Sequence, residues 1–578
     1  MIAGVATLIV SHQLFTSPLD TSEAFILVGS DPAVLRLVPR GPGHGERDVA
    51  VIVVSTPSRV HGNQLRYPYT LSILNETIGV DGYDLLQAIR SHLEGWRARP
   101  ALATETPLLV LQVPITRTAS GPIERYDVYA FLLGRTALDL GAKLGLWDRS
   151  QPLGTLLGTA TADIGGIDLT PLNVQRTLSA PAASHLNAIG NAGSVRFSAV
   201  GAGALGSQLL VNLARAGLRP RLVADADHLL PHNLARHALF DSAIGETKAS
   251  ALAIALNSIL DEPPAVNGLA IDVLDPRRAD RAEVFRDVDS VLDLSASVAV
   301  SRHLSVYSDR DARRIAIFLS PTGNDLVVLA EDRERTVPLD VLEMNYYWDV
   351  ATNESLAGHF GTPEAIRYGV SCRDVSSFIP QSVVAVHAGN AARALSRIFH
   401  ENHASSFLWS LDAETGTVLR TNLGTSPMRL SAVDEWTVAL SERLVEDLAR
   451  ERMRHVPGET GGLLIGRFDH LYKRVYVVGY LPAPPDSISW PTGFIRGVQG
   501  IKAELANVTA RTANALEYVG EWHSHPEFTS SAPSHTDEDL YRWLDELLRP
   551  TGKPPVMLII GSDGARCVMA VSETSAVP

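Results

Sequence analysis

A glycine-rich turn between a strand-like segment and a helix-like segment limits the folds that are open to the middle of this chain. Within the run RFSAVGAGALGSQLL (Arg196–Leu210), Gly201, Gly203 and Gly206 follow the pattern Gly-x-Gly-x-x-Gly. Such a turn lets the backbone approach a phosphate, and the helix after it offers free N–H groups. By itself the pattern fits a dinucleotide, a mononucleotide or a tight turn without a ligand.

The length and texture of the chain predict an α/β multidomain protein. It has 578 residues, several times the usual domain of about 150. Short apolar runs mixed with helical stretches predict a mixed α/β domain over residues 1–185. Strand-like and helix-like segments then alternate, which predicts a Rossmann-like domain with a parallel sheet over residues 186–428. A third α/β domain is expected over residues 429–578. The run Ser179–Gly193 is either a linker or a helical lead-in.

Composition excludes several classes of protein. Hydrophobic residues make up 45% and charged residues 20%, which is ordinary globular composition. The formal net charge of −14 argues against a general nucleic-acid binder, because phosphate neutralisation needs clustered Lys and Arg. The apolar start lacks the basic region of a signal peptide and is too short to cross a bilayer, so we expect a first core strand there. No nucleic-acid or membrane partner is expected, and the predicted location is cytoplasmic.

The chain has only two cysteines, Cys372 and Cys567. They cannot build a disulfide framework or a cysteine zinc site, so any metal must be held by His, Asp or Glu. We expect Cys567, inside a strand-like segment, to be a core residue.

The C-terminal run EWHSHPEFTSSAPSHTDED holds the densest set of metal-ligating side chains. His523 and His525 are two residues apart at the end of a predicted strand, so both imidazoles point to one face. With Asp537 they make a three-ligand zinc set that leaves a fourth position for water. A proton acceptor is needed beside that water, and Glu459 in the run HVPGETGGLLIGR is the candidate.

Two neighbouring residues are not expected to bind the metal. We interpret His535 as a loop residue and expect Glu521 to alternate away from the ligand face. An amphipathic helix is predicted over Val433–Arg454, because Trp436 and three leucines recur at spacings of four.

Together, Glu459, the run HSHP from His523 and the run SHTD from Ser534 resemble the JAMM (JAB/MPN) metalloprotease motif. The resemblance covers about the last 150 residues. It implies zinc-dependent hydrolysis of isopeptide or peptide bonds at the C-terminal tail of a ubiquitin-like protein. It also implies that His523, His525 and Asp537 bind Zn²⁺, that Glu459 is the acid/base and that Ser534 hydrogen-bonds the oxyanion. Eleven residues separate His525 from Asp537 where ten are commoner in the family, and a one-residue loop insertion absorbs the difference.

The segment after the glycine turn gives the turn a more specific meaning. Asp225 ends the next strand-like segment some twenty residues on, which suits a ribose hydroxyl. The chain continues DADHLLPHNLARH and then GETK, which resembles the D-x-D…N-L-x-R-Q…G-x-x-K run of the ThiF/MoeB and ubiquitin-activating enzyme family. This implies binding of ATP with Mg²⁺ and adenylation of the C-terminal glycine of a ubiquitin-like protein. Asn233, Arg236 and Lys248 would then contact phosphates. Relatives are commonly dimeric, so a homodimer through this domain is expected.

Two departures bear on adenylation, and one cysteine bears on a later thioester step. Ala296 occupies the position of the family's magnesium-binding Asp, although Asp293 remains on the strand before it. No arginine-rich lead-in precedes the glycine turn, and Arg176 is a substitute only by rough distance. Cys372 lies in a region that resembles the thioester cysteine region of ubiquitin-activating enzymes, and a structural cysteine is the alternative.

These observations leave three hypotheses. In the first, the ThiF-like domain binds and adenylates the Gly-ended tail of a ubiquitin-like protein and the JAMM domain trims or removes it. In the second, the ThiF-like domain is a non-catalytic docking module. In the third, both act on a sulfur-carrier protein for cofactor biosynthesis. Residues 1–185 are either a degenerate conjugating-enzyme fold, which without a cysteine forms no thioester, or a substrate-binding domain.

Overall fold

The structure of the chain is a computed structural model. It describes residues 7–18, 25–28, 34–39, 50–60, 68–79, 82–96, 100–147, 164–189, 195–260, 264–307, 312–361, 365–367, 375–377, 379–433 and 435–568. The chain divides into two compact units, residues 1–183 with 258–263 and residues 184–257 with 264–578. Within the described ranges, no helix has the length and apolar character that crossing a membrane requires.

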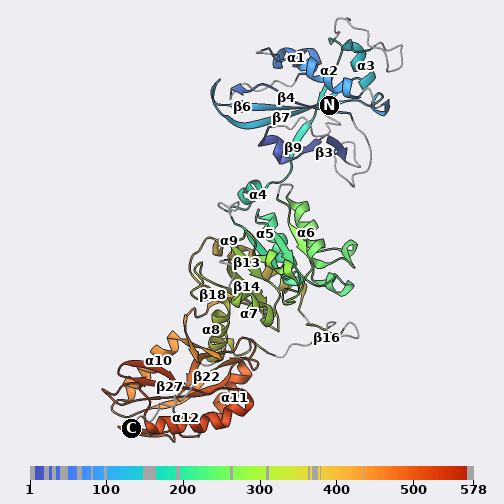
Figure 1. The fold of residues 1–578 in the computed structure, drawn as a ribbon. Coiled ribbons are helices and arrows are strands. Elements are labelled where there is room, and N and C mark those ends of the chain that lie inside the picture. The colour runs from blue at the N-terminus through green and yellow to red at the C-terminus, as the bar shows by residue number, and fades with distance from the viewer. Residues whose placement is uncertain are drawn as a thin grey trace. The chain divides into compact units, whose positions relative to one another are not determined.

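The first unit is mixed α/β, with two sheets (Figure 1). One has the strand order β2-β3-β1-β9, and the other β4-β6-β7-β8 with β5 beside β6. The strands are β1 (Thr7–Val10), β2 (Phe25–Val28), β3 (Val34–Pro39), β4 (Val51–Ser55), β5 (Arg59–Val60), β6 (Leu108–Thr116), β7 (Ile123–Leu133), β8 (Leu169–Pro171) and β9 (Asn173–Arg176). The helices are α1 (Leu71–Ile78), α2 (Leu85–Trp96) and α3 (Ala137–Lys143).

Strand β6 shows how this unit is layered, because every one of its residues is buried. Leu109 and Leu111 pack with the apolar faces of the three helices. Leu108 and Val110 point the other way and pack with the four-stranded sheet through Leu8 and its neighbours. A strand covered on both faces reads as a continuous apolar run, which explains why LLVL lacks alternation in the sequence.

The second unit begins with helix α4 (Ala180–Leu186), which lies across the first boundary and inside the predicted linker. Its first sheet has eight strands in the order β12-β11-β10-β13-β14-β15-β18-β19. The strands in this region are β10 (Phe197–Val200), β11 (Leu222–Ala224), β12 (Asn267–Leu269), β13 (Ser290–Asp293), β14 (Arg313–Leu319), β15 (Asp325–Ala330), β16 (Ala365–Arg367), β17 (Val375–Ser377), β18 (Ser405–Leu411) and β19 (Val418–Asn422). The helices are α5 (Ala204–Arg215), α6 (Lys248–Ile259), α7 (Val298–Val306), α8 (Leu339–Thr352) and α9 (Gln381–Ile398).

The glycine turn lies at the switch point of this sheet. The five neighbouring strands β12, β11, β10, β13 and β14 are parallel. From β10 the chain adds β11 and then β12 on one side, and it then adds β13 and β14 on the other side of β10. The turn follows β10, at the carboxyl ends of the parallel strands, where α/β sheets bind ligands. The predicted parallel sheet is confirmed for these five strands, whereas β15, β18 and β19 are antiparallel additions.

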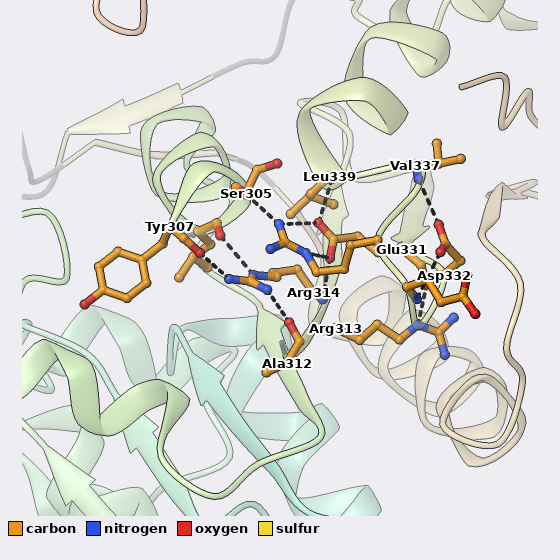
Figure 2. Close-up of polar contacts among 12 residues, drawn as sticks. Ser305, Tyr307, Ala312, Arg313, Arg314, Glu331, Asp332, Val337 and Leu339 are labelled. Carbon is orange, nitrogen blue, oxygen red and sulfur yellow. Dashed lines mark hydrogen bonds and ion pairs between the residues drawn. The ribbon is translucent and has the colours of Figure 1, made fainter. Parts of the chain in front are cut away.

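A buried polar network fixes the start of helix α8 (Figure 2). The backbone N–H of Arg314 donates to Oε2 of Glu331 at 3.0 Å, and the N–H of Leu339 donates to Oε1 at 2.8 Å. Arg314 also donates through Nε to the carbonyl of Leu304 at 3.0 Å. Asp332 accepts from the N–H of Val337 at 2.8 Å. The two carboxylates therefore join the sheet to the start of α8, and the Arg314 guanidinium joins it to the end of α7.

The C-terminal part of the second unit has a seven-stranded sheet in the order β20-β21-β23-β22-β26-β27-β28, and a hairpin of β24 and β25. The strands are β20 (Met428–Val433), β21 (Trp436–Ser441), β22 (Gly461–Asp469), β23 (Arg474–Leu481), β24 (Ile488–Trp490), β25 (Gly493–Ile495), β26 (Glu517–Ser524), β27 (Val556–Gly561) and β28 (Gly564–Val568). The helices are α10 (Glu442–His455), α11 (Ile501–Arg511) and α12 (His535–Leu548).

The predicted helix over Val433–Arg454 is wrong in its first half. Trp436 and Leu440 belong to strand β21, and the helix starts only after Ser441, which caps it by accepting from Leu444 N–H. Four apolar residues at spacings of four cross a strand–helix boundary here, because a spacing of four also keeps residues on one face of a strand.

The two parts of the second unit share one apolar core. Helix α8 is buried on nearly all sides, and Leu342 and Tyr346 pack in the same cluster as Ile465 of β22 and Val478 of β23. A helix that is buried on nearly all sides lies between layers rather than on a surface, and α8 does so although it carries the buried polar residues Asp340, Glu343 and Asn345. The predicted division at residue 428 therefore separates two parts that pack together, and it stays a prediction.

Candidate functional site

The three predicted metal ligands converge in the C-terminal part. His523 lies near the end of β26, His525 follows the strand, and Asp537 lies in the first turn of α12. Nε2 of His523 lies 2.9 Å from Oδ1 of Asp537, and Nε2 of His525 lies 3.2 Å from Oδ2. One ligand atom from each residue lies within 4.8 Å of the others, and all three side chains are buried.

The donor set fits a metal ion. Nε2 of His523 is buried and forms no hydrogen bond of acceptable geometry with any described residue, although Asp537 is near. A buried polar atom without a well-formed hydrogen bond is costly, and a cation bound by both His523 and Asp537 would remove that cost. Two imidazoles and one carboxylate are a set that catalytic zinc sites use. Burial alone would raise the pKa of Asp537, but the two histidines hold it well below its ordinary range.

Contacts outside the ligand set fix its geometry. Nδ1 of His525 lies 2.6 Å from the carbonyl oxygen of Ser530, which leaves Nε2 to face Asp537. Arg452 of α10 is buried and donates to the carbonyls of His525 and Pro526 at 2.9 and 2.7 Å. Arg452 was not predicted from the sequence, where it is one of several arginines on an amphipathic helix.

Glu459 lies shortly before β22 and lines the same cavity as the ligands. Thr460 N–H donates to Oγ of Ser524 at 3.0 Å, and Ser524 N–H donates to the carbonyl of Thr460 at 2.7 Å. The segment is thereby fastened to the strand that carries His523. Burial raises the pKa of the Glu459 carboxyl, which suits a group that takes up and returns a proton.

Gly461 shows why this segment needs glycine. It pairs with His523 across the two strands. A Cβ atom there would lie 2.5 Å from the carbonyl oxygen of Trp522 and 2.8 Å from the ring of Phe494. A larger residue would therefore push apart the strands that hold Glu459 and the predicted ligands.

Ser534 is the N-cap of α12. Its N–H and its hydroxyl both donate to Oδ2 of Asp537 at 2.7 Å, so the serine orients the carboxylate. Its role toward an oxyanion stays a prediction. His535 was expected in a loop and is instead the first residue of α12, fully exposed and outside the ligand cluster.

The expectation for Glu521 is wrong. It lies two residues before His523 on the same strand, so the two side chains share a face, and both line the cavity. Glu521 is buried and pairs with Arg496 at 3.0 Å. Burial raises the pKa of the Glu521 carboxyl, and Arg496 opposes that shift. The cavity has a volume of about 580 Å³ and is also lined by apolar residues of the hairpin and α12.

The backbone of the glycine turn packs closely against neighbouring backbone. Gly201 has φ of +100°, and a Cβ atom on it would lie 2.6 Å from the carbonyl carbon of Leu294. A Cβ on Gly206 would lie 2.5 Å from the carbonyl oxygen of Gly201, whereas a Cβ on Gly203 would meet nothing within 4 Å. Two of the glycines thus serve packing, and Gly203 faces open space.

Asp225 lies beside this turn, as expected. Its Oδ2 accepts from Ala202 N–H at 2.6 Å, and its Oδ1 accepts from Asp227 N–H at 2.8 Å. Lys248 pairs with Asp227 at 2.9 Å, which brings the predicted lysine into the same cluster. His237 supports the turn, with Nε2 2.7 Å from the carbonyl oxygen of Ala202, and burial lowers its pKa. The sequence offered no signal for His237.

Asn233 and Arg236 lie in and after a short 3-10 helix, Pro231–Ala235. The side chain of Asn233 accepts from Leu230 N–H at 2.9 Å, and Arg236 donates to the carbonyl of Ile379 at 3.2 Å. Gln208 of α5 donates to the carbonyl of Arg236 at 2.7 Å, which anchors this segment to the helix after the turn.

Asp293 lies at the carboxyl end of β13, buried, and accepts from the N–H and hydroxyl of Ser295 at 3.0 and 2.6 Å. Burial raises its pKa to about 6. Asp293 and Ala296 line a cavity of about 220 Å³ together with Glu343 and Tyr347.

The remaining predicted residues lie elsewhere. Arg176 belongs to the first unit, where its guanidinium lies over the ring of Phe15. Cys372 lies outside the described residues. Cys567 in β28 packs against the core of the C-terminal sheet, and burial raises the pKa of its thiol to about 12.

Known families match the two parts of the second unit. Residues 182–317 match the ThiF family, and residues 441–572 match the prokaryotic homologs of the JAB domain. A CD-NTase/cGAS isopeptidase of Enterobacter hormaechei subsp. hoffmannii (strain UCI 50) is 32% identical over 133 residues, which are 22% of this chain and 70% of that protein. The ATP-dependent ubiquitin transferase-like protein Cap2 of the same strain is 32% identical over 181 residues.

Coverage differs between these relatives. The Cap2 match spans 30% of this chain and 27% of Cap2, so the chain matches about a quarter of that protein. A crystal structure of E. coli MccB with ATP has 16% identity and a TM-score of 0.31, with 43% of this chain and 68% of that chain covered. The chain belongs to the proteins that join a ThiF-family domain to a C-terminal domain of the prokaryotic JAB family.

Proposed function

We propose that the JAB domain is a zinc-dependent peptidase or isopeptidase that acts on the C-terminal tail of a ubiquitin-like protein. The observation that carries the proposal is the buried cluster of His523, His525 and Asp537, in which Nε2 of His523 has no hydrogen bond to a described residue. The relative whose name includes isopeptidase supports the reaction class, because this chain covers 70% of its length.

Each residue then has a stated task. His523 and His525 through Nε2, and Asp537 through its carboxylate, would hold Zn²⁺, which supplies a bound water that ionises near neutral pH. Glu459 would accept a proton from the attacking water at its carboxylate and return it to the leaving amine. Ser534 orients Asp537 and would offer its hydroxyl to the developing oxyanion.

The test is hydrolysis by the full chain of a Gly-ended ubiquitin-like protein linked to a lysine side chain. Glu459→Gln keeps the shape of the side chain but removes the proton acceptor. We expect it to lower kcat by roughly 10² to 10⁴-fold at unchanged zinc content. Wild-type activity in Glu459→Gln would contradict the assignment. His535→Ala is the matched control, because His535 is exposed beside the cluster and binds none of it.

For the ThiF domain we propose binding of ATP, with Gly201, Gly203 and Gly206 around the phosphates and Asp225 at the ribose. Asn233, Arg236 and Lys248 would contact phosphates. Adenylation of the Gly-ended tail, with Mg²⁺, is the corresponding activity. The name of the Cap2 relative, which includes ubiquitin transferase-like and ATP-dependent, supports this.

A docking function without adenylation is the second candidate, and Ala296 favours it because its methyl group cannot bind a cation. ATP–pyrophosphate exchange that depends on a Gly-ended partner protein separates the two. Exchange supports adenylation for a protein or a sulfur-carrier pathway, whereas ATP binding without exchange supports docking.

A further inference from the structure

The JAB cavity contains a second charged group besides the metal ligands and Glu459. Arg496, one residue after β25, donates through Nε to Oε2 of Glu521 at 3.0 Å and through Nη2 to Oε1 at 3.2 Å. The hydroxyl of Tyr518 donates to the same carboxylate at 3.1 Å. Glu521 and Arg496 both line the cavity, and Glu521 is two residues before His523. A rigid guanidinium therefore stands on the wall that carries a predicted metal ligand.

Other hydrogen bonds besides this pair hold the segment after the hairpin. Asp486 accepts from the N–H groups of Val498 and Gln499 at 3.0 and 2.9 Å, and Ser487 accepts from Gly497 N–H at 2.9 Å. A buried ion pair is also weak evidence for stability, because apolar side chains of similar volume often serve as well. The position of the pair on the cavity wall points to a use beyond folding.

The hydrogen bonds of Arg496 show which of its N–H groups remain available. Nε and Nη2 bind Glu521, and Nη1 donates to the carbonyl of Gly497 at 3.1 Å. An arginine has five N–H groups, so one on each Nη has no hydrogen-bond acceptor within the part of the chain that the structure describes. Its side chain is 27% exposed, which leaves these groups access to the cavity.

We propose that Arg496 is a substrate-binding residue that donates hydrogen bonds to a backbone carbonyl of the extended tail, with Glu521 and Tyr518 fixing its direction. This rests on the proposed function, because glycine has no side chain to recognise. A Gly-ended tail presents only N–H and C=O groups near the bond to be cleaved. Selective binding there requires donors aimed at carbonyl oxygens, and a guanidinium held on one edge supplies them.

Binding to the full chain with Glu459→Gln tests the inference without requiring cleavage. The probe is a fluorescent hexapeptide ending in Gly-Gly and joined through an isopeptide bond to lysine. The test variant adds Arg496→Met and Glu521→Gln, which removes both charges and leaves Tyr518 an acceptor. The matched control adds Asp486→Ala, which removes the two hydrogen bonds from Val498 and Gln499 that hold the same segment. Zinc content and thermal unfolding are measured for each.

We expect the Arg496→Met/Glu521→Gln variant to bind the probe at least about 10-fold more weakly at equal zinc content, and the Asp486→Ala variant to bind it normally. Equal weakening in both variants would show that the pair only supports the segment, and unchanged binding would show that Arg496 does not touch the tail; either result overturns the inference. Absence of binding when Arg496 is intact overturns it too. Cleavage of the same probe is measured with the wild-type chain, in which Glu459 is intact. If the wild-type chain does not cleave the probe but binding still depends on Arg496, the proposed function fails and the inference stands.

Discussion

The guanidinium of Arg302 in the ThiF domain lies 2.9 Å from the carboxylate of Asp469 in the JAB domain. Nε of Arg302 also lies 3.1 Å from Glu343 of α8, and all three side chains are buried. Beside this pair, Asp340 of α8 accepts from the hydroxyl of Tyr476 on β23 at 2.6 Å. Charged and apolar contacts thus join the two domains into one unit.

We expect Arg302→Ala to destabilise this unit by about 3–5 kcal/mol, because it removes the guanidinium that pairs with the buried carboxylates of Glu343 and Asp469. Chemical denaturation followed by tryptophan fluorescence measures the change. Arg196→Ala is the control, since its pair with Asp289 is exposed and surface pairs contribute little. An unchanged midpoint in Arg302→Ala would mean that the buried network does not join the domains.

Zinc content should depend on the three converging residues. Wild type is expected to bind about one equivalent, and the double change His523→Ala/His525→Ala is expected to bind none, because two of three ligands are lost. Elemental analysis after dialysis measures this. Glu521→Gln lies in the same cavity wall and should keep the metal, so zinc loss in that variant would argue for a different ligand set.

The glycine turn predicts different outcomes for neighbouring positions. Gly206→Ala should destabilise the ThiF domain, because its Cβ would lie 2.5 Å from the carbonyl oxygen of Gly201. In Gly203→Ala the added Cβ meets no atom within 4 Å, so the free energy of unfolding should fall by only about 0.5 kcal/mol or less. If a phosphate lies against this position, the same methyl group should lower the affinity for ATP roughly 10-fold. Calorimetric titration with ATP gives the affinity. Normal affinity in Gly203→Ala would remove that position from the phosphate site.

The pKa of Asp293 predicts a pH dependence of stability. Burial raises it from 3.8 to about 6, so the folded state prefers the protonated acid and ionisation opposes folding. This contribution to stability is present below pH 3.8 and is lost as pH rises through 6, by about 3 kcal/mol. Asp293→Asn has no carboxyl group to ionise and should not show this loss. The free energy of unfolding of the variant, relative to wild type, should therefore rise between about pH 4.5 and 7.5.

Thermal unfolding at both pH values checks this. Asp275→Asn is the control with the opposite sign, because Arg277 holds the pKa of Asp275 at about 2. The stabilising contribution of ionised Asp275 is fully present above pH 3.8 and is lost as the pH falls through about 2. The same difference from wild type at both pH values for Asp293→Asn would contradict the assignment.

Local patterns predicted the candidate sites because the chemistry lies in short runs. The spacing of His523, His525 and Asp537 predicted a cluster that the fold brings together. The strand–turn–helix around Gly201 and the alternating segments after it predicted a parallel sheet, and the strands from β10 to β14 form one. The predicted helix was wrong at Trp436 and Leu440, because a spacing of four residues fits one face of a strand as well as one face of a helix. The predicted direction of Glu521 was wrong, because residues two apart on a strand, such as Glu521 and His523, point to the same face.

The amino-acid order alone predicts which atoms can bind a metal or a phosphate, because ligand chemistry depends on side-chain type and local spacing. Which distant groups surround those atoms depends on the packing of the folded chain. Arg452 reaches His525 from another helix, Arg496 enters the cavity from the residue after a hairpin, and Arg302 reaches Asp469 from helix α7, far earlier in the chain. Such pairs depend on how helices and sheets pack against one another, and the spacing of residues within a short segment does not show that packing.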